Sequence, residues 1–332
     1  MPLVSVLTPT YDRVDRLPGA IRTVRAQTHD DVEHVVVNDG STDGTRAYLD
    51  GVDDDRVRVR HNDGNRGIAY SFNRAADAAD GEFYCILGDD DRWHPEKVDR
   101  QLAAFREADD RFGVAYTGGV LTAGGRVSRR YRPTREGNIY PEILAAFGLH
   151  PHSGHMLTRE AFEAAGGFDE AMERGVDWEM CVRLARVTEF LPVPGVLVQR
   201  PRHGGAISDQ PEQTRVHDYI YEKYREEFAA HPAVDRAFRA NRARIRAYNA
   251  ARAGERRPAV REAATALRLR PSVAHLGLLL TGLVGRRSFD LAARLRRAVA
   301  DARADDAETD AGAEWWAEPD PGPDPNGAAT RV

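Results

Sequence analysis

Apolar and polar positions alternate in blocks along the first hundred residues of the chain. Short apolar runs that are rich in β-branched residues or alternate in polarity predict strands at residues 3–8, 32–39, 56–60 and 82–87. Amphipathic or capped stretches predict helices at 17–27, 41–50 and 68–79, and a further helix that begins at Pro95. Strands that alternate with helices predict an α/β fold with a mostly parallel sheet flanked by helices.

Polar residues gather where three of the predicted strands end. The clusters are TPTYD at 8–12, NDGSTD at 38–43 and GDDD at 88–91. In parallel sheets, ligands bind just beyond the carboxyl ends of the strands. These clusters are therefore the first candidates for a functional site.

The pattern changes twice along the rest of the chain. From about 112 to 210, strand-like and helix-like segments are mixed, and after about 212 the pattern is helical throughout. Residues 304–332 are rich in Asp, Glu, Ala, Gly and Pro, a composition typical of disorder. The Trp315–Trp316 pair in this tail is either a small docking motif or a chance retention, and we favour chance.

Composition and charge narrow the class of protein. A length of 332 residues suits one large domain or two smaller ones, and 42% apolar residues is ordinary for a globular protein. The net charge of −5 argues against a general nucleic-acid binder. We expect the two cysteines, Cys85 and Cys181, to be buried thiols rather than a disulfide or part of a zinc site.

Nothing in the sequence has the pattern of a leader or a membrane span. The start, MPLVSVLTPTYDR, lacks the basic region and the apolar segment of a signal peptide. The longest apolar run, at 273–285, is shorter than the roughly 20 residues that a membrane span needs. We therefore expect a cytoplasmic protein. Its arginine-rich helical part carries an apolar stripe, for which we favour packing on the rest of the protein over peripheral contact with the inner face of a membrane or binding of a partner.

Three consecutive carboxylates, Asp89, Asp90 and Asp91, follow the apolar run at 82–87. They repel one another unless a cation neutralises them, and oxygen ligands select hard ions such as Mg²⁺ or Mn²⁺. Such an ion can bridge a diphosphate and stabilise the charge that develops as the diphosphate leaves. The same aspartates can equally cap the helix expected after them. The three residues alone leave both interpretations open.

Seven segments together resemble the family 2 glycosyltransferases, which have the GT-A fold. In chain order they are VSVLTPTYDR at 4–13, VVVNDGSTDGT at 35–45, NRGIAYSFNRA at 65–75, GDDDRWHPEKV at 88–98, GGFDE at 166–170, VDWEMCVRLA at 176–185 and RPRHGGAIS at 200–208. The resemblance implies a GT-A domain over 1–210, Rossmann-like, with nucleotide-sugar binding in about 1–100 and the acceptor side in about 101–210. A helical extension over 211–303 and an acidic, disordered tail over 304–332 would follow it.

The resemblance assigns a nucleotide-sugar pocket to residues of the first hundred positions. Pro9 and Tyr11 would line the base pocket, with the Tyr11 ring against the nucleobase. Asp39 would accept a hydrogen bond from a ring N–H of the base, as a carboxylate can, although it could also only cap a turn. Asp89 would lie near the ribose, and Arg66 is placed to meet the base or the diphosphate.

The resemblance also implies a divalent cation, Mg²⁺ or Mn²⁺. Asp90 would be its principal ligand and Asp91 the neighbouring one. His203 matches a histidine that can complete the metal or diphosphate site. The sequence departs from the frequent D-x-D-D form because Gly88 stands at the position of its first aspartate, and this leaves open which carboxylate meets the ribose.

Asp177 matches the aspartate that acts as general base in inverting members of the family. An inverting transfer needs one carboxylate to take the proton of the acceptor hydroxyl while that oxygen attacks the anomeric carbon. Family members often have Glu-Asp here, whereas this chain has Val176-Asp177. Glu179 is a weaker alternative as base, and Asp177 could also be the N-cap of its own helix.

Three histidines in HPHSGH, at 150, 152 and 155, have a metal-like spacing. We favour a place for them in the acceptor-side wall over a zinc site. The Trp93 and Trp178 side chains are expected in the core or in the same wall.

The resulting prediction is a metal-dependent, inverting glycosyltransferase. It would move a sugar from a nucleoside-diphosphate donor, by family habit a UDP-sugar, to a hydroxyl of a glycan or a lipid-linked acceptor. A catalytically inactive sugar-nucleotide-binding protein, acting through its helical region, is the alternative, and turnover discriminates the two. A nucleotidyltransferase is disfavoured because TPTYDRVDR is not a glycine-rich triphosphate loop. An NAD-linked dehydrogenase is disfavoured because no G-x-G-x-x-G follows the first strand.

Overall fold

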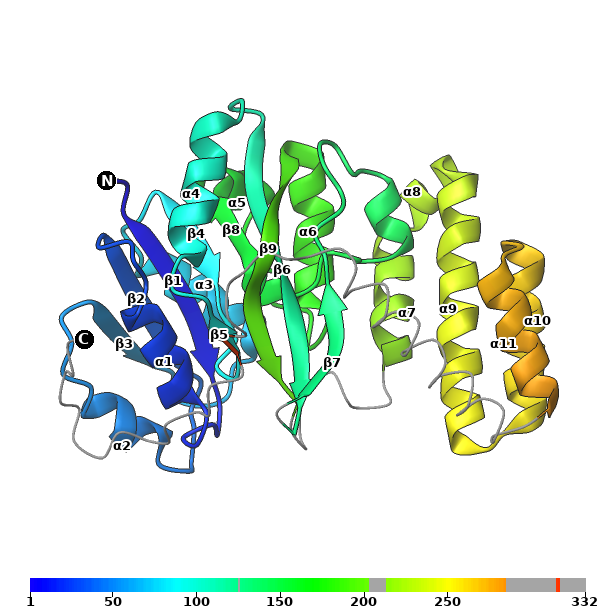
Figure 1. Cartoon of the computed structure of the whole chain (residues 1–332), viewed down its shortest axis with the longest axis horizontal. Coiled ribbons are helices and arrows are strands. Elements are labelled where there is room, and N and C mark those ends of the chain that lie inside the picture. Colours follow the sequence, from blue (N-terminus) through cyan, green and yellow to red (C-terminus); the bar gives the residue numbers. More distant parts are fainter. Residues whose placement is uncertain (125, 203–212, 285–314, 317–332) are drawn as a thin grey trace. The chain divides into compact units, whose positions relative to one another are not determined.

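The computed structural model describes residues 1–124, 126–202, 213–284 and 315–316 (Figure 1). These residues divide into two compact units. Unit 1 takes its residues from Met1–Tyr140, Phe147–Gly204 and the C-terminal Glu314–Val332, and unit 2 takes them from Pro141–Ala146 and Gly205–Ala313.

The first half of unit 1 has the predicted alternation of strands and helices. Its strands are β1 (Val4–Thr10), β2 (Val32–Asn38), β3 (Val57–His61) and β4 (Phe83–Ile86), connected through α1 (Leu17–Arg25), α2 (Thr45–Asp50) and α3 (Ile68–Asp77). They pair in parallel in the order β3-β2-β1-β4. The β-α-β prediction for this half is confirmed, and β1 and β4 end side by side.

The second half of unit 1 continues the same sheet with mixed strand directions. Its elements are β5 (Arg92–Trp93), α4 (Lys97–Glu107), β6 (Phe112–Ala123), β7 (Arg126–Tyr131), η2 (His152–Gly154), β8 (His155–Thr158), α5 (Arg159–Ala165), α6 (Val176–Val187) and β9 (Glu189–Pro201). In the part of the chain that is described, the sheet has nine strands in the order β3-β2-β1-β4-β8-β6-β9-β5, with β7 paired to β6. Strand β8 is antiparallel to both its neighbours, whereas β9 runs parallel to β6.

The sheet is covered on both faces because its strands are apolar on both sides. On one face, Ala20 of α1 and Leu102 of α4 pack in one cluster with Val6 and Cys85 of the strands. On the other face, the ring of Tyr84 meets Phe162 of α5 edge-on at 5.3 Å. Figure 1 shows the sheet between these helices. Both cysteines are buried free thiols, as expected.

The segment after the three aspartates differs from the prediction. The helix expected from Pro95 begins at Lys97, with Glu96 as N-cap. Strand β5 lies between Asp91 and this helix and pairs with β9. The alternative in which the aspartates cap the helix is therefore wrong.

Unit 2 is helical over its described residues. It holds η1 (Glu142–Ala145), α7 (Gln213–Lys223), α8 (Arg225–Ala230), α9 (Pro232–Ala253), α10 (Arg256–Leu269) and α11 (Val273–Val284). Small residues at the contacts, such as Ala247, Ala259 and Ala263, let α9, α10 and α11 pack around Leu278. Within the described residues, no helix is both long and apolar enough to cross a membrane.

Candidate active site at the end of β4

The loop that carries Asp89, Asp90 and Asp91 follows β4 directly and lies beside the end of β1. The hydroxyl of Thr10, the last residue of β1, donates to Asp89 Oδ2 at 2.8 Å. Burial raises the pKa of Asp89 to about 7, and the neighbouring Asp90 carboxylate adds to this. Burial also raises the pKa of Asp91 to about 6, against the opposing effect of Arg200. The protein therefore holds these carboxyls where negative charge is disfavoured.

Ser153 fixes the shape of this loop from the other half of the sheet. Its hydroxyl donates a short hydrogen bond to Asp91 Oδ2 and accepts one from the Gly88 N–H at 3.0 Å. Its carbonyl accepts from Trp93 Nε1 at 2.8 Å. Ser153 is buried in η2, just before β8, so the antiparallel part of the sheet delivers it to the acidic loop.

The glycine that replaces the first aspartate of the family pattern has a local reason. A Cβ built on Gly88 would lie 3.2 Å from Asp91 Oδ2 and 3.3 Å from Asp90 Oδ1. The two carboxylates thus converge on one side of the Gly88 backbone. Contacts that short are tighter than nine in ten real Cβ contacts, so a side chain at position 88 would push both oxygens away by a few tenths of an ångström.

Arg200 of β9 connects the acidic loop to Asp177. Its Nε lies 3.5 Å from Asp91 Oδ1 in an ion pair. Asp91 raises the pKa of Arg200, and Tyr131, Asp90 and Asp177 add to this. Asp177 also faces His150, whose pKa is lowered by burial while the Asp177 carboxylate opposes the shift. The structure therefore brings Asp177 into the electrostatic neighbourhood of the three aspartates.

Asp177 lies in the first turn of α6 but does not cap it, because the N-cap is Gly175. Its Oδ1 accepts from the backbone N–H of Trp178 at 2.8 Å, and the residue is only half-buried. Glu179, by contrast, is fully buried and held in an ion pair with Arg183 at 2.7 Å. Glu179 is therefore the poorer candidate for exchanging protons with a ligand.

Asp39 organises the loop that precedes α3. Its Oδ1 accepts from Asn62 Nδ2 at 2.6 Å and from the Arg66 N–H at 2.8 Å, and its Oδ2 accepts from the Gly67 N–H at 2.9 Å. Its own N–H donates to the Thr10 carbonyl at 2.8 Å, which ties this loop to the end of β1. Asp39 therefore does more than cap a turn, because it joins the loop before α3 to the end of β1.

The other residues assigned to the nucleotide pocket have contrasting environments. Pro9 is buried within β1, where it is in register with Val37. The Tyr11 side chain, just past β1, is 42% exposed, so its ring is available to a ligand. The guanidinium carbon of Arg66 lies 4.6 Å from the centre of the Tyr70 ring.

The described residues can supply only some of the ligands that a divalent cation needs. Within the described residues, no three His, Cys, Asp or Glu side chains converge as a ligand set. The paired oxygens of Asp90 and Asp91 fit a hard ion that completes its shell with water and diphosphate oxygens, as Mg²⁺ commonly does. His203, the third ligand expected from the sequence, lies outside the described residues.

The three histidines at 150, 152 and 155 lie close together; His155 is buried, and His150 and His152 are half-buried. Burial lowers the pKa of His152 to about 3 and that of His155 well below its usual value. The rings of His152 and His155 meet edge-on at 5.1 Å, and Phe147 contacts His150 at 4.8 Å. These are neutral rings in an aromatic cluster beside the site. The zinc alternative finds no support in the described residues.

The sequence pointed to the acidic loop, but it missed Ser153 and Arg200. Both lie inside motifs that were noted for their histidines, HPHSGH and RPRHGGAIS. A serine or arginine carries no signal of its own, and only the order of the strands places these two beside Asp91.

Comparison with known proteins agrees with this architecture. Residues 5–164 match the model of glycosyl transferase family 2. A Bacillus subtilis protein assigned to teichuronic acid biosynthesis as glycosyltransferase TuaG is 36% identical over 124 residues, which are 37% of this chain and 48% of that protein. Chondroitin synthase of Pasteurella multocida is 29% identical over 210 residues, which are 61% of this chain and 21% of the synthase. The chain thus spans about half or less of the length of these relatives.

Solved structures share the fold at low sequence identity. Residues 1–349 of TarS from S. aureus superpose with a TM-score of 0.57, 16% identity and 83% of each chain covered. A mannosyltransferase of Pyrobaculum calidifontis superposes with a TM-score of 0.58 and 18% identity, covering 90% of this chain and 86% of that one. Residues 5–164 of this chain therefore form a glycosyl transferase family 2 domain, and the fold is GT-A.

Proposed function

We propose that the protein is a metal-dependent, inverting glycosyltransferase that uses a nucleoside-diphosphate sugar. The observation that carries the proposal is the cluster of carboxyls at 89–91, in which Asp89 and Asp91 have raised pKa values and Asp91 pairs with an arginine that also interacts with Asp177. A site that disfavours its own negative charge gains free energy when a cation arrives.

The donor would lie over the ends of β1 and β4. Asp90 and Asp91 are the residues to hold Mg²⁺ or Mn²⁺, with His203 as a further ligand, and the ion would neutralise charge on the departing diphosphate. The Tyr11 ring would stack on the base. The Asp39 carboxylate accepts hydrogen bonds from three N–H groups. Since a carboxylate has about four acceptor positions, one position remains for an N–H of the base.

The transfer itself would use Asp177. The acceptor hydroxyl oxygen attacks the anomeric carbon as the bond from that carbon to the diphosphate oxygen breaks. The electron pair of the broken bond goes to the diphosphate, and the hydroxyl proton goes to the Asp177 carboxylate. Attack from the face opposite the diphosphate inverts the anomeric configuration.

The class of donor and acceptor rests on the relatives. TarS has been solved with UDP-GlcNAc, and the Pyrobaculum mannosyltransferase with GDP-Man and Mn²⁺. Several curated relatives are named for teichuronic acid, chondroitin or hyaluronan. We therefore propose a UDP-sugar as donor, with a GDP-sugar as the alternative, and a glycan, free or lipid-linked, as acceptor.

Release of nucleoside diphosphate from a panel of UDP-, GDP- and dTDP-sugars tests the proposal. We expect release from one donor with Mn²⁺ and loss of release with EDTA or in Asp90→Asn. Asp177→Asn should lose transfer by about 10²–10⁴-fold, the contribution of a general base, while still binding the donor. Asp63→Asn, an exposed carboxylate in a nearby loop, is the matched control.

Binding of a donor without turnover on any acceptor would instead favour the alternative, a sugar-nucleotide-binding protein without catalysis. Near-normal transfer by Asp177→Asn would show that another group is the base. Neither binding nor turnover with any donor would contradict the assignment of the acidic loop.

One surface of unit 2, on α11, has features that support peripheral contact with a membrane. Four apolar side chains of α11 are 45% or more exposed, and their spacing of three and four residues puts them on one face: Val273, Leu276, Leu280 and Leu283. Over residues 213–284, Arg and Lys outnumber Asp and Glu two to one, although the whole chain has a net charge of −5. We propose that this face enters an anionic lipid surface, where apolar and cationic groups act together.

Flotation with vesicles of anionic or neutral lipid tests this contact. We expect binding to anionic vesicles that Leu280→Glu abolishes, whereas Ala264→Glu, which puts the same charge on an exposed position of α10, retains it. Equal flotation of the two variants, or no flotation of the intact protein, would contradict the membrane proposal. Dimerisation that Leu280→Glu abolishes would identify a second copy as the occupant.

A further inference from the structure

The Trp315–Trp316 pair contacts the strands of unit 1 near the acidic loop. Figure 1 draws the pair as the short red segment near β5. The Trp315 indole N–H donates to the Val196 carbonyl at 3.0 Å, and its ring meets the His94 ring edge-on at 5.5 Å. Both tryptophans are half-buried. These contacts go against the interpretation of the pair as a chance retention.

The second tryptophan is held from the side of β9 and β7. Gln199 Nε2 donates to the Trp316 carbonyl at 3.1 Å. The guanidinium carbon of Arg130 lies 5.5 Å from the centre of the Trp316 ring, within the range of a cation–π interaction. Each tryptophan thus makes one hydrogen bond and one ring contact with the sheet. The partners lie in β9, in β7 and just after β5.

The surface under the pair is an incomplete sheet edge. Strand β9 has 13 residues, but β5, its partner on the outer side, has only Arg92 and Trp93. The His94 N–H still bonds the Leu197 carbonyl at 3.0 Å. The next residue is Pro95, which has no N–H to offer. An uncovered stretch of edge exposes unpaired backbone groups, and the tail supplies the donor that Val196 receives.

We propose that Trp315 and Trp316 form a clasp that docks in cis on this edge and holds β5 in place against β9. Strand β5 begins at the residue after Asp91, so the clasp also restrains the acidic loop. The edge formed by His94, Val196 and Gln199 is thus a binding site for the Trp-Trp segment of the same chain. The docking goes beyond the proposed function, and its effect on donor binding rests on that function.

Hydrogen exchange of the intact protein and of the full-length double variant Trp315→Ala, Trp316→Ala tests the clasp. We expect the backbone amides of Arg92, Trp93 and His94 to exchange about tenfold faster in the variant, the scale set by the loss of the Trp315 N–H bond together with the ring contacts to His94 and Arg130. Amides of β1 and β2 should keep their rates, which separates local release of β5 from failure to fold.

Two further variants separate the individual contacts. Trp315→Phe keeps an aromatic ring at His94 but loses the donor to Val196, so we expect an intermediate acceleration. Gln199→Ala removes the bond to Trp316 from the other side and should act in the same direction. A peptide of residues 311–320, added to the double variant, should restore protection, whereas the same peptide with Ala-Ala should not.

Three results would overturn the inference. Unchanged exchange at β5 in the double variant would show that the pair does not restrain this edge. Protection that rises with protein concentration would mean that the tail of a second copy occupies the edge. Acceleration that extends equally to β1 and β2 would mean a general loss of stability rather than a clasp. As a linked readout, the concentration of Mn²⁺ needed for half-maximal donor binding should rise in the double variant.

Discussion

Replacement of Asp39 by asparagine separates the structural role of this carboxylate from its role toward the nucleotide. The carboxylate accepts three N–H groups, two at Oδ1 and one at Oδ2. An amide has only one oxygen, so its NH₂ group must face at least one donor. With the amide oxygen toward Asn62 and Arg66, the N–H of Gly67 loses its bond to residue 39 and keeps only the longer one to Asn65 Oδ1, at 3.2 Å.

The size of the effect follows from these contacts. A hydrogen bond to a charged group contributes about 1.5–3 kcal/mol, and the bonds that remain weaken when the charge is lost. We therefore expect Asp39→Asn to lower the free energy of unfolding of unit 1 by about 2–3 kcal/mol. For a unit of this size, 1 kcal/mol shifts Tm by about 2–4 °C, so Tm should fall by about 4–12 °C.

Intrinsic tryptophan fluorescence is a clean assay for unit 1. All four tryptophans of the chain, at 93, 178, 315 and 316, fall within its bounds. Unfolding of unit 2 therefore does not mask the transition. Asp63→Asn, an exposed carboxylate in the same loop, should stay within about 0.5 kcal/mol of the parent protein.

Two outcomes would refute parts of this reasoning. If Asp39→Asn melts within about 2 °C of the parent, Asp39 does not hold the loop at 62–67. If the variant melts early but binds nucleoside diphosphate with parental affinity below its transition, the fourth acceptor position is not used by the base. Only a loss of both stability and affinity supports both roles.

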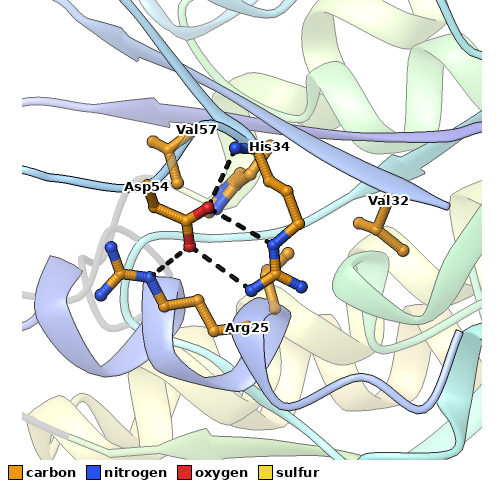
Figure 2. Close-up of a pocket in the computed structure, with 7 residues that line it drawn as sticks. Arg25, Val32, His34, Asp54 and Val57 are labelled. Carbon is orange, nitrogen blue, oxygen red and sulfur yellow. Dashed lines mark hydrogen bonds and ion pairs between the residues drawn. The ribbon is translucent and has the colours of Figure 1, made fainter. Parts of the chain in front are cut away.

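Three further predictions concern titrating groups and their supports. Burial lowers the pKa of His34 to about 3, beside Arg25 in the pocket of Figure 2. Below pH 6.5 the unfolded chain therefore binds a proton at His34 that the native protein does not, so the free energy of unfolding falls as the pH falls. In His34→Gln this fall should be smaller than in the parent by about 1.4 kcal/mol per pH unit between pH 6 and 4. Parallel plots of unfolding free energy against pH, measured by urea titration, would contradict this. Ser153→Ala should weaken Mn²⁺-dependent nucleotide binding by about 10–100-fold, the scale for a group that orients a metal ligand, with little effect if Asp91 needs no such support. Binding of Mn²⁺ with nucleotide near pH 6.5 should release protons from Asp89 and Asp91, because a cation favours their ionised forms; calorimetry in two buffers of different ionisation enthalpy measures this, and equal heats would contradict it.

Local patterns in the sequence were sufficient for the elements that carry the acidic loop. The runs at 3–8 and 82–87 predicted β1 and β4 because buried parallel strands are continuously apolar, and both were found within one to two residues at most ends. The position of Asp89 beside Thr10 follows from the parallel pairing of these strands. Strand β5 was missed, since two residues are too few to show a period.

Long-range partners were beyond the same reasoning. Ser153, in η2, is 62 residues from Asp91 along the chain, and Arg200 lies in β9. The placement of Ser153 depends on β8 pairing antiparallel with β4 and β6, and that of Arg200 on β9 pairing with β6 and β5. Periodicity gives the length of a strand but not its neighbour or direction. The supports of the acidic loop therefore became visible only with the fold.

The direction of the pKa shifts is the strongest physical argument for the cation proposed at this site. Arg200 lowers the pKa of Asp91 and Arg13 lowers that of Asp89, yet both values stay raised. The cations of the protein itself therefore do not compensate for burying these carboxyls together. A diphosphate brings further negative charge to the same place, so binding it without a metal would increase the imbalance. Under the proposed function, an ion that arrives with the donor would stabilise the carboxylates and the diphosphate at once, and this double effect would explain why a folded protein keeps a cluster that costs it stability.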